Sequence, residues 1–404
     1  MTERPVDDDS AFGINWAGSA LVAVGMLLMN VAVYAFSLIA AHLLIPAEFG
    51  AFTALLSILQ IGSVASLGLQ AAGARRIAVA AADHAATVST VVRSTAWVSV
   101  LVGAAVALSA PLATEILRLD SPWLVPLCGV ALVPLTAMGG LSAIAQGSER
   151  WGVLTAINIA NGAGRLGAGA LALWLSPTVF GAMVGLAIGA LAPAVVALLA
   201  LDLPRRAATP TSRRSLLGES LLSTTTLCAF FAFGNIDALV ARNQLSEHQS
   251  GLYAAGLIIS KTALLGPGFV SVVLFPRFAR DTTGASRLRG VVIVAAIGAM
   301  GVALVAALPR LATEFAGGHQ YAGISDRLWL FALAGSLLGV AQLLVFDALA
   351  RHTHWIAWLL ASAAVAVPVI AVVADVGVTG LVATVAGVTA VLTVALLPQG
   401  SRRR

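Results

Sequence analysis

Charged residues are scarce in this chain, and their spacing limits what it can fold into more than any motif does. Only 10% of the 404 residues are Asp, Glu, Lys or Arg. Most of them separate apolar blocks of roughly 25–35 residues, and a helix of that length crosses a bilayer core of ~30 Å. Since 59% of the residues are hydrophobic, the chain is predicted to be an all-α polytopic membrane protein.

Twelve membrane-spanning helices are predicted from these blocks. Strands of a membrane barrel are excluded because the blocks are too long and show no alternation with a period of two. Each span must be helical, since lipid offers no partner for backbone N–H and C=O groups. The predicted spans are residues 16–44, 49–74, 88–112, 122–146, 151–175, 178–201, 215–241, 250–276, 290–312, 327–350, 354–374 and 377–398.

The basic residues predict which helix ends face the cytoplasm. With the N-terminus inside, all but six of the 23 Lys and Arg residues fall on the cytoplasmic side, as the positive-inside rule requires. Two of the six, Arg165 and Lys261, fall within spans. Both termini are therefore expected in the cytoplasm. The net charge of +5 is explained by this topology and by anionic lipids, so no nucleic-acid partner is expected.

The chain divides into two similar halves. A basic linker at 202–214 separates two predicted six-helix lobes, 16–201 and 215–398, and cytoplasmic tails at 1–15 and 399–404 flank them. Adding 201 to residues of the second helix aligns it with the eighth without gaps. The matched pairs include Leu44 and Leu245, Gly50 and Gly251, Phe52 and Tyr253, and Arg76 and Arg277. Such pseudo-symmetric repeats place a transporter's substrate path between the lobes.

Two stretches carry a family resemblance. Residues 41–78, AHLLIPAEFGAFTALLSILQIGSVASLGLQAAGARRIA, contain a short turn with Pro and Phe-Gly, then a helix ending in Arg. Residues 235–280, NIDALVARNQLSEHQSGLYAAGLIISKTALLGPGFVSVVLFPRFAR, contain an Asp, a Gly-x-Tyr, a mid-helix Lys and a final Pro-Arg. This pattern resembles Wzx-type polysaccharide and oligosaccharide flippases of the multidrug/oligosaccharidyl-lipid/polysaccharide (MOP) exporter superfamily.

The resemblance implies a V-shaped, two-lobed transporter in the bacterial cytoplasmic (inner) membrane. It would move a polyprenyl-pyrophosphate-linked oligosaccharide from the cytoplasmic to the outer leaflet by alternating access. Its partners would be this lipid-linked glycan, membrane lipids and proteins that polymerise or assemble the glycan. Neither a cofactor nor a metal site is expected, and coupling to an ion gradient or to the membrane potential stays open.

Lys261 is the first candidate for binding the substrate. It is the chain's single lysine and lies near the middle of the eighth predicted helix, where a charge is costly unless it faces protein or water. We expect it to attract a pyrophosphate or an acidic sugar; the alternative is a structural salt bridge with Asp237, which could instead serve in ion coupling. Gln60 is its counterpart at the offset of 201. Gly266, Pro267 and Gly268 follow as a predicted hinge.

A second set of polar groups lies in the fifth predicted helix. Asn158, Asn161 and Arg165 share one face, because spacings of three and seven residues return to the same side of a helix. Guanidinium and amide groups suit phosphate and sugar oxygens; hydrogen bonding between packed helices is the alternative. Asn30 is a further candidate at membrane depth. Asp347 is expected to form a surface pair with Arg351.

Two other functions compete with the flippase. A drug or organic-cation antiporter of the same superfamily should have acidic groups in its cavity, whereas Lys261 and Arg165 outnumber Asp237 here. A membrane-embedded glycan polymerase or glycosyltransferase would need a sizeable external loop, and the predicted external loops are short. The protein is therefore expected not to be an enzyme and to have no catalytic residues.

Overall fold

The computed structural model describes residues 16–80, 84–203, 225–264, 285–350 and 355–397, and all regular structure in these ranges is helical. The predicted tails, most of the linker and the predicted hinge Gly266–Gly268 lie outside them. The first half contains α1 (Trp16–Leu43), α2 (Pro46–Gly62), α3 (Val64–Val79), α4 (His84–Leu108), α5 (Ala110–Ile116), α6 (Leu124–Gly147), α7 (Trp151–Leu175), α8 (Val179–Gly189) and α9 (Leu191–Ala200). The second contains α11 (Ile236–Gln244), α12 (Glu247–Ala263), α14 (Ala285–Ala307), α15 (Pro309–Ala316), the 3₁₀ helix η2 (His319–Arg327), α16 (Leu328–Ala350), α17 (Ile356–Val373) and α18 (Val378–Leu396).

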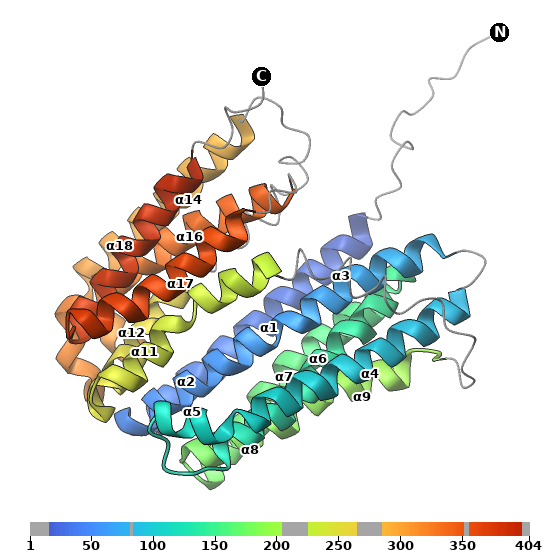
Figure 1. The fold of residues 1–404 in the computed structure, drawn as a ribbon, viewed down its shortest axis with the longest axis horizontal. Coiled ribbons are helices and arrows are strands. Elements are labelled where there is room, and N and C mark those ends of the chain that lie inside the picture. Colours follow the sequence, from blue (N-terminus) through green and yellow to red (C-terminus); the bar gives the residue numbers. More distant parts are fainter. Residues whose placement is uncertain (1–15, 81–83, 204–224, 265–284, 351–354, 398–404) are drawn as a thin grey trace.

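The helices are arranged as two lobes (Figure 1). In the N-terminal lobe α7 packs against α1 and α8, and α6 packs against α3 and α4. In the C-terminal lobe α16 packs against α12, α14 and α18. The ribbons of the two lobes converge where α1 ends and α2 begins, and they diverge toward the end where α1 begins and α18 ends. We call the first of these the junction end.

Nine helical segments of the described chain are long and apolar enough to cross a membrane, so the predicted all-α polytopic class is confirmed. They are Ala20–Leu43, Pro46–Val79, His84–Leu108, Leu124–Gly147, Val179–Ala200, Arg287–Ala307, His319–Leu349, Ile356–Val373 and Val378–Leu396. The predicted span 151–175 is helical but carries the polar stripe, and spans 215–241 and 250–276 extend into residues outside the described ranges. The count of twelve and the cytoplasmic termini stay predictions.

Local sequence signals account for several helix starts at the junction end. Pro46 is the first residue of α2, where its fixed φ and missing N–H are tolerated. Ser246 and Gln249 form a capping box at the start of α12, each side chain bonding the other's backbone N–H. Thr178 caps α8 by accepting a hydrogen bond from the Gly181 N–H. These local signals determine the residues at which α2, α8 and α12 begin.

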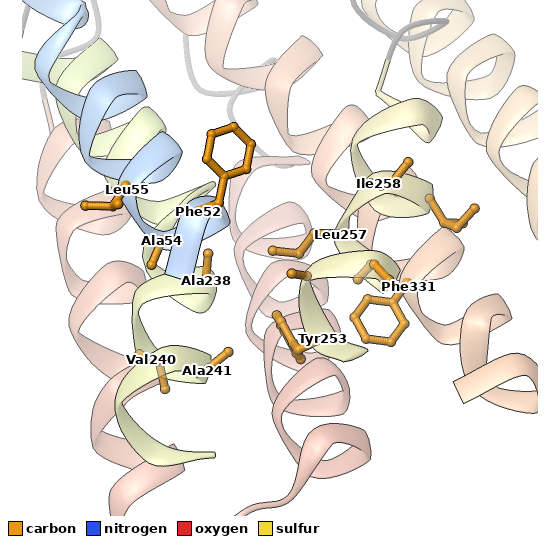
Figure 2. Close-up of a cluster of buried hydrophobic side chains, with 14 of the residues drawn as sticks. Phe52, Ala54, Leu55, Ala238, Val240, Ala241, Tyr253, Leu257, Ile258 and Phe331 are labelled. Atoms are coloured by element: carbon orange, nitrogen blue, oxygen red, sulfur yellow. The ribbon is translucent and has the colours of Figure 1, made fainter. Parts of the chain in front are cut away.

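The main contact between the lobes is α2 packed against α11 and α12. Buried apolar side chains fill it, among them Phe52 of α2, Ala241 of α11 and Leu257 of α12 (Figure 2). Tyr253 of α12 packs edge-on against Phe331 of α16 with their ring centroids 5.1 Å apart, a favoured aromatic geometry. The interface therefore continues into the core of the C-terminal lobe.

Two glycines matched by the repeat meet in this contact. A Cβ on Gly251 would lie 1.9 Å from the carbonyl oxygen of Pro46, and one on Gly50 would lie 2.8 Å from the backbone nitrogen of Gly251. A Cβ atom cannot lie so close to a non-bonded atom, so α2 and α12 approach this closely only because both positions lack a side chain. The offset of 201 found in the sequence thus relates residues that touch across the lobes.

A buried ion pair fixes the C-terminal lobe and corrects one expectation. Asp347 is 2% exposed and its Oδ2 lies 3.6 Å from Nε of Arg287, itself 6% exposed. Arg287 also donates to the carbonyls of Leu396 and Leu397. The expected surface position of Asp347 is therefore wrong, because this face of α16 packs against α14, which brings a buried arginine to the carboxylate. Its expected partner Arg351 lies outside the described residues.

We predict that Gly251→Ala destabilises the protein by about 1–3 kcal/mol, as overpacking of a tight contact does. The added methyl group would meet backbone atoms of Pro46, which cannot move aside as a side chain could. The thermal unfolding midpoint of the purified protein in detergent measures the effect. Gly387→Ala is the control, because a Cβ there has no atom within 4 Å; equal midpoints for both variants would contradict the steric argument.

Candidate functional site

Lys261 connects the two lobes. Its Nζ donates to Oδ1 of Asn235 at 2.5 Å and to Oε1 of Gln60 at 3.3 Å. Asn235 precedes α11 in the C-terminal lobe, whereas Gln60 lies in α2 of the N-terminal lobe. The half-buried ammonium therefore bonds to neutral amide oxygens from both lobes. Lys261 and Gln60 are the pair that the sequence repeat matched.

Two residues that the sequence reasoning missed hold this arrangement. Asn235 donates its Nδ2 to the carbonyl of Phe231 at 2.8 Å, which turns its Oδ1 toward Lys261. Tyr34 of α1 donates its hydroxyl to the main-chain carbonyl of Lys261, a further contact between the lobes. The sequence contains a signal for each residue. Asn235, preceded by Gly234, interrupts an apolar block, and Tyr34 is one of only three tyrosines in the chain.

Asp237 of α11 lies near Lys261 and is buried. It is 6% exposed, and its oxygens accept hydrogen bonds from the Ala238 N–H at 2.8 Å and from the Tyr253 hydroxyl at 3.2 Å. Asp237 and Lys261 line the same small cavity of about 20 Å³. The ion pairs found among the described residues do not join these two side chains, so the alternative of a structural salt bridge between them is not seen, and Lys261 contacts Asn235 instead.

Arg165 lines a larger cavity in the N-terminal lobe. This cavity has a volume of about 100 Å³ and is lined by Arg165, Gln60, Ser37, Ser63 and apolar side chains of α1, α2 and α8. The Nε of Arg165 is buried and has no hydrogen-bond partner within the described part of the chain. Gln60 is common to both groups, since it lines the Arg165 cavity and bonds Lys261.

The remaining predicted residues lie elsewhere. Asn158 and Asn161 are 8% and 7% exposed, and Asn161 donates its Nδ2 to the sulfur of Met29 on α1 at 3.3 Å. Asn30 lies exposed on α1. The structure therefore brings Lys261, Gln60 and Arg165 around two neighbouring cavities, places Asn161 in the α1–α7 contact, and leaves Asn30 apart. In the described ranges, no three His, Cys, Asp or Glu residues gather as a metal would require.

Comparison with solved structures shows which known fold the chain shares. The chain is similar to the inward-facing conformation of a multidrug resistance MATE family transporter of the MOP superfamily, with a TM-score of 0.75 at 13% identity over 95% of this chain and 97% of that one. The eukaryotic MATE transporter AtDTX14 gives 0.63 at 13% identity, covering 95% of each chain. The outward-facing conformation of a MATE family transporter of the MOP superfamily also gives 0.63 at 13% identity, covering 95% of this chain and 94% of that one. The chain therefore has the fold of the MATE transporters.

Comparison with family models identifies the family to which the chain belongs. The model described as "Polysaccharide biosynthesis protein" matches residues 15–281, and no curated protein matches the sequence. The chain belongs to this polysaccharide biosynthesis family, and the resemblance to Wzx-type flippases of the MOP superfamily is confirmed. Family and fold point to a transporter rather than an enzyme.

We predict that Lys261→Met lowers the free energy of unfolding by about 1–3 kcal/mol, the cost of leaving two amide oxygens without their donor. Asp347→Ala should cost about 3–5 kcal/mol, because it removes the carboxylate that contacts the buried guanidinium of Arg287. Denaturation of the purified variants in detergent compares the two. A larger loss for Lys261→Met would show that Lys261 is chiefly a structural residue.

Proposed function

We propose that this protein moves a polyprenyl-pyrophosphate-linked oligosaccharide from the cytoplasmic to the outer leaflet of the bacterial inner membrane by alternating access. The polysaccharide biosynthesis family and the MOP transporter fold support this proposal. The observation that carries it is the ammonium of Lys261, which two neutral amides from opposite lobes hold between the halves of the transporter.

The charges of the site favour an anionic substrate. A cation inside a membrane protein is costly unless an opposite charge or several dipoles compensate it. Arg287 has such a counter-ion in Asp347, whereas Lys261 has amide oxygens and the Arg165 Nε has no partner in the described structure. A pyrophosphate would supply the missing negative charge, and the guanidinium of Arg165 could hold two of its oxygens.

Binding and lobe movement are linked at Gln60. A phosphate oxygen that displaces the Gln60 amide, which lies 3.3 Å from the ammonium, would remove one bond between the lobes and replace it with a stronger charged one. Gln60 would then be free to turn toward the Arg165 cavity that it already lines. The substrate would in this way loosen the inner contact of α2 with α12 while being held by both cations.

Other parts of the proposal stay predictions. Asp237 would take part in coupling to an ion gradient, and Gly266–Gly268 would bend the eighth helix. Asn158, Asn161 and Asn30 would contact the sugar only if the lobes rearrange, because two of them are buried and the third lies apart. The polyprenyl tail would remain in the lipid, and glycan polymerase or assembly proteins would take over the product.

We predict that Lys261→Ala slows transport roughly 10- to 100-fold, the range expected when a hydrogen bond to a charged group is lost. Lys261→Arg should restore much of the rate because it restores the charge. Arg165→Gln should slow transport at least roughly tenfold for the same reason. The measurement is the leaflet distribution of the lipid-linked oligosaccharide in a bacterial strain that lacks this protein and expresses each variant.

The control is Arg310→Ala, which removes an exposed arginine far in sequence from the site and should transport as the parent does. Wild-type transport by Lys261→Ala would refute recognition by charge. If the strain lacking the protein keeps a normal leaflet distribution but becomes sensitive to cationic drugs, the protein is an organic-cation antiporter and the flippase proposal fails.

A further inference from the structure

At the junction end, each lobe sends a short segment toward the other lobe. Helix α5 follows α4, and helix α15 follows α14; both have a proline in their first two positions. The backbone takes a positive φ just after each short helix, at Arg118 (φ 47°), two residues beyond α5, and at Gly317 (φ 134°), directly beyond α15. These turns end the helices and direct the next side chains across the boundary between the lobes.

The first crossing is a reciprocal exchange between two arginines. Arg118 of the N-terminal lobe donates its Nη2 to the carbonyls of Arg242 and Leu245 at the end of α11. Arg242 in turn donates its Nε to the carbonyl of Leu117 and its Nη2 to that of Arg118, both at 2.9 Å. Arg242 is 1% exposed, whereas Arg118 is exposed. Each guanidinium thus caps the helix end from which the other projects.

In the second crossing, all the donors belong to the C-terminal lobe. Gln320 of η2 donates its Nε2 to the carbonyls of Ala41 at 2.8 Å and Leu44 at 3.4 Å, at the end of α1. The hydroxyl of Tyr321 also donates to the Ala41 carbonyl, at 3.2 Å. Here the C-terminal lobe caps a helix of the N-terminal lobe.

The two crossings are related by the internal repeat. The accepting carbonyls of the second, Ala41 and Leu44, are the counterparts of Arg242 and Leu245 at the offset of 201. The same two positions at the end of the first helix of each lobe therefore receive donors from the opposite lobe. A chance contact between loops would not be expected to repeat itself at matched carbonyls.

We propose that these crossings form a two-part latch, in which Arg118 with Arg242 and Gln320 with Tyr321 hold the lobes together at the outer side of the membrane. The last carbonyls of a helix have no partner within it, and the negative end of its dipole favours a cationic donor. Side chains from the opposite lobe supply the missing donors while the lobes are together. Water can replace them when the lobes separate, so the latch opens without leaving polar groups unpaired in lipid.

The role of the latch in transport rests on the proposed function. Its effect on the separation of the lobes does not, and can be measured without substrate. The experiment uses the full-length protein in lipid nanodiscs, with Cys128→Ala and Cys228→Ser removing the two natural cysteines. Spin labels on Ser176→Cys and Ala374→Cys, two exposed positions at the junction end of different lobes, report the separation of the lobes by pulsed electron paramagnetic resonance. The variants are Arg118→Ala, Gln320→Ala and the two combined.

We predict that Arg118→Ala raises the fraction of molecules with a longer label separation roughly tenfold, the effect of losing about two ordinary hydrogen bonds. Gln320→Ala should have a smaller effect, and the double variant the largest. Arg310→Ala, which also removes an exposed arginine at this end, should leave the separation unchanged. The Arg118 side chain is exposed, so its removal leaves no cavity, and unfolding midpoints check that the variants are folded.

Unchanged separations in both single variants and the double variant would refute the latch, whatever the leaflet assay shows. An equal shift in Arg310→Ala would also refute it, because a general loss of positive charge would then be the cause. A shift that follows the predicted order supports the latch even if the leaflet distribution of the lipid-linked glycan proves independent of this protein, in which case only the proposed substrate is wrong.

Discussion

The crossing of α2 and α12 is the contact on which the rest of the structure depends. Lipid provides no hydrophobic force between helices, so close packing at small residues has to hold them, and Gly50 and Gly251 allow backbones to touch. Gln60 and Lys261 each lie ten residues further along their helix, about 15 Å at the usual helical rise. Because both helices start at the junction end, the two side chains reach the same depth and meet there.

The cations of the C-terminal lobe illustrate how environment separates structural from functional charge. Arg287 is compensated by Asp347 and by two carbonyls at the end of α18, which is a closed arrangement. Lys261 is held by amide oxygens, and the carboxylate of Asp237, which lines the same cavity, accepts a hydrogen bond from Tyr253 and forms no direct ion pair with Lys261. A group left without a full counter-charge inside a membrane protein is available to an anionic ligand. The candidate site therefore differs from the Arg287 site in that its lysine has no direct ion pair among the described residues.

The sequence predicted the class of fold, the family and one cross-lobe pair, but not the groups around that pair. The repeat matched Gln60 with Lys261, and the two side chains form a hydrogen bond across the lobes. Asn235 and Tyr34 could not be found in this way, since their roles depend on a break in the helix before α11 and on a main-chain carbonyl. The spacing of the polar residues of α7 predicts that they lie on one face of the helix. The structure gives them different surroundings: Asn161 bonds Met29 of α1, whereas Arg165 lines a cavity.

The sequence by itself determined that the chain is helical and crosses a membrane repeatedly, because block length and the cost of unpaired backbone groups in lipid leave no other solution. The expectation of a MOP transporter came from the resemblance of residues 41–78 and 235–280 to that superfamily. Only the tertiary structure decided which polar groups share an environment: Asp347 with Arg287, Lys261 with Asn235, and Arg118 with Arg242. Periodicity gives the face of a helix on which a side chain lies. Periodicity cannot show which neighbouring helix, or which carbonyl at a helix end, that face contacts in the folded protein.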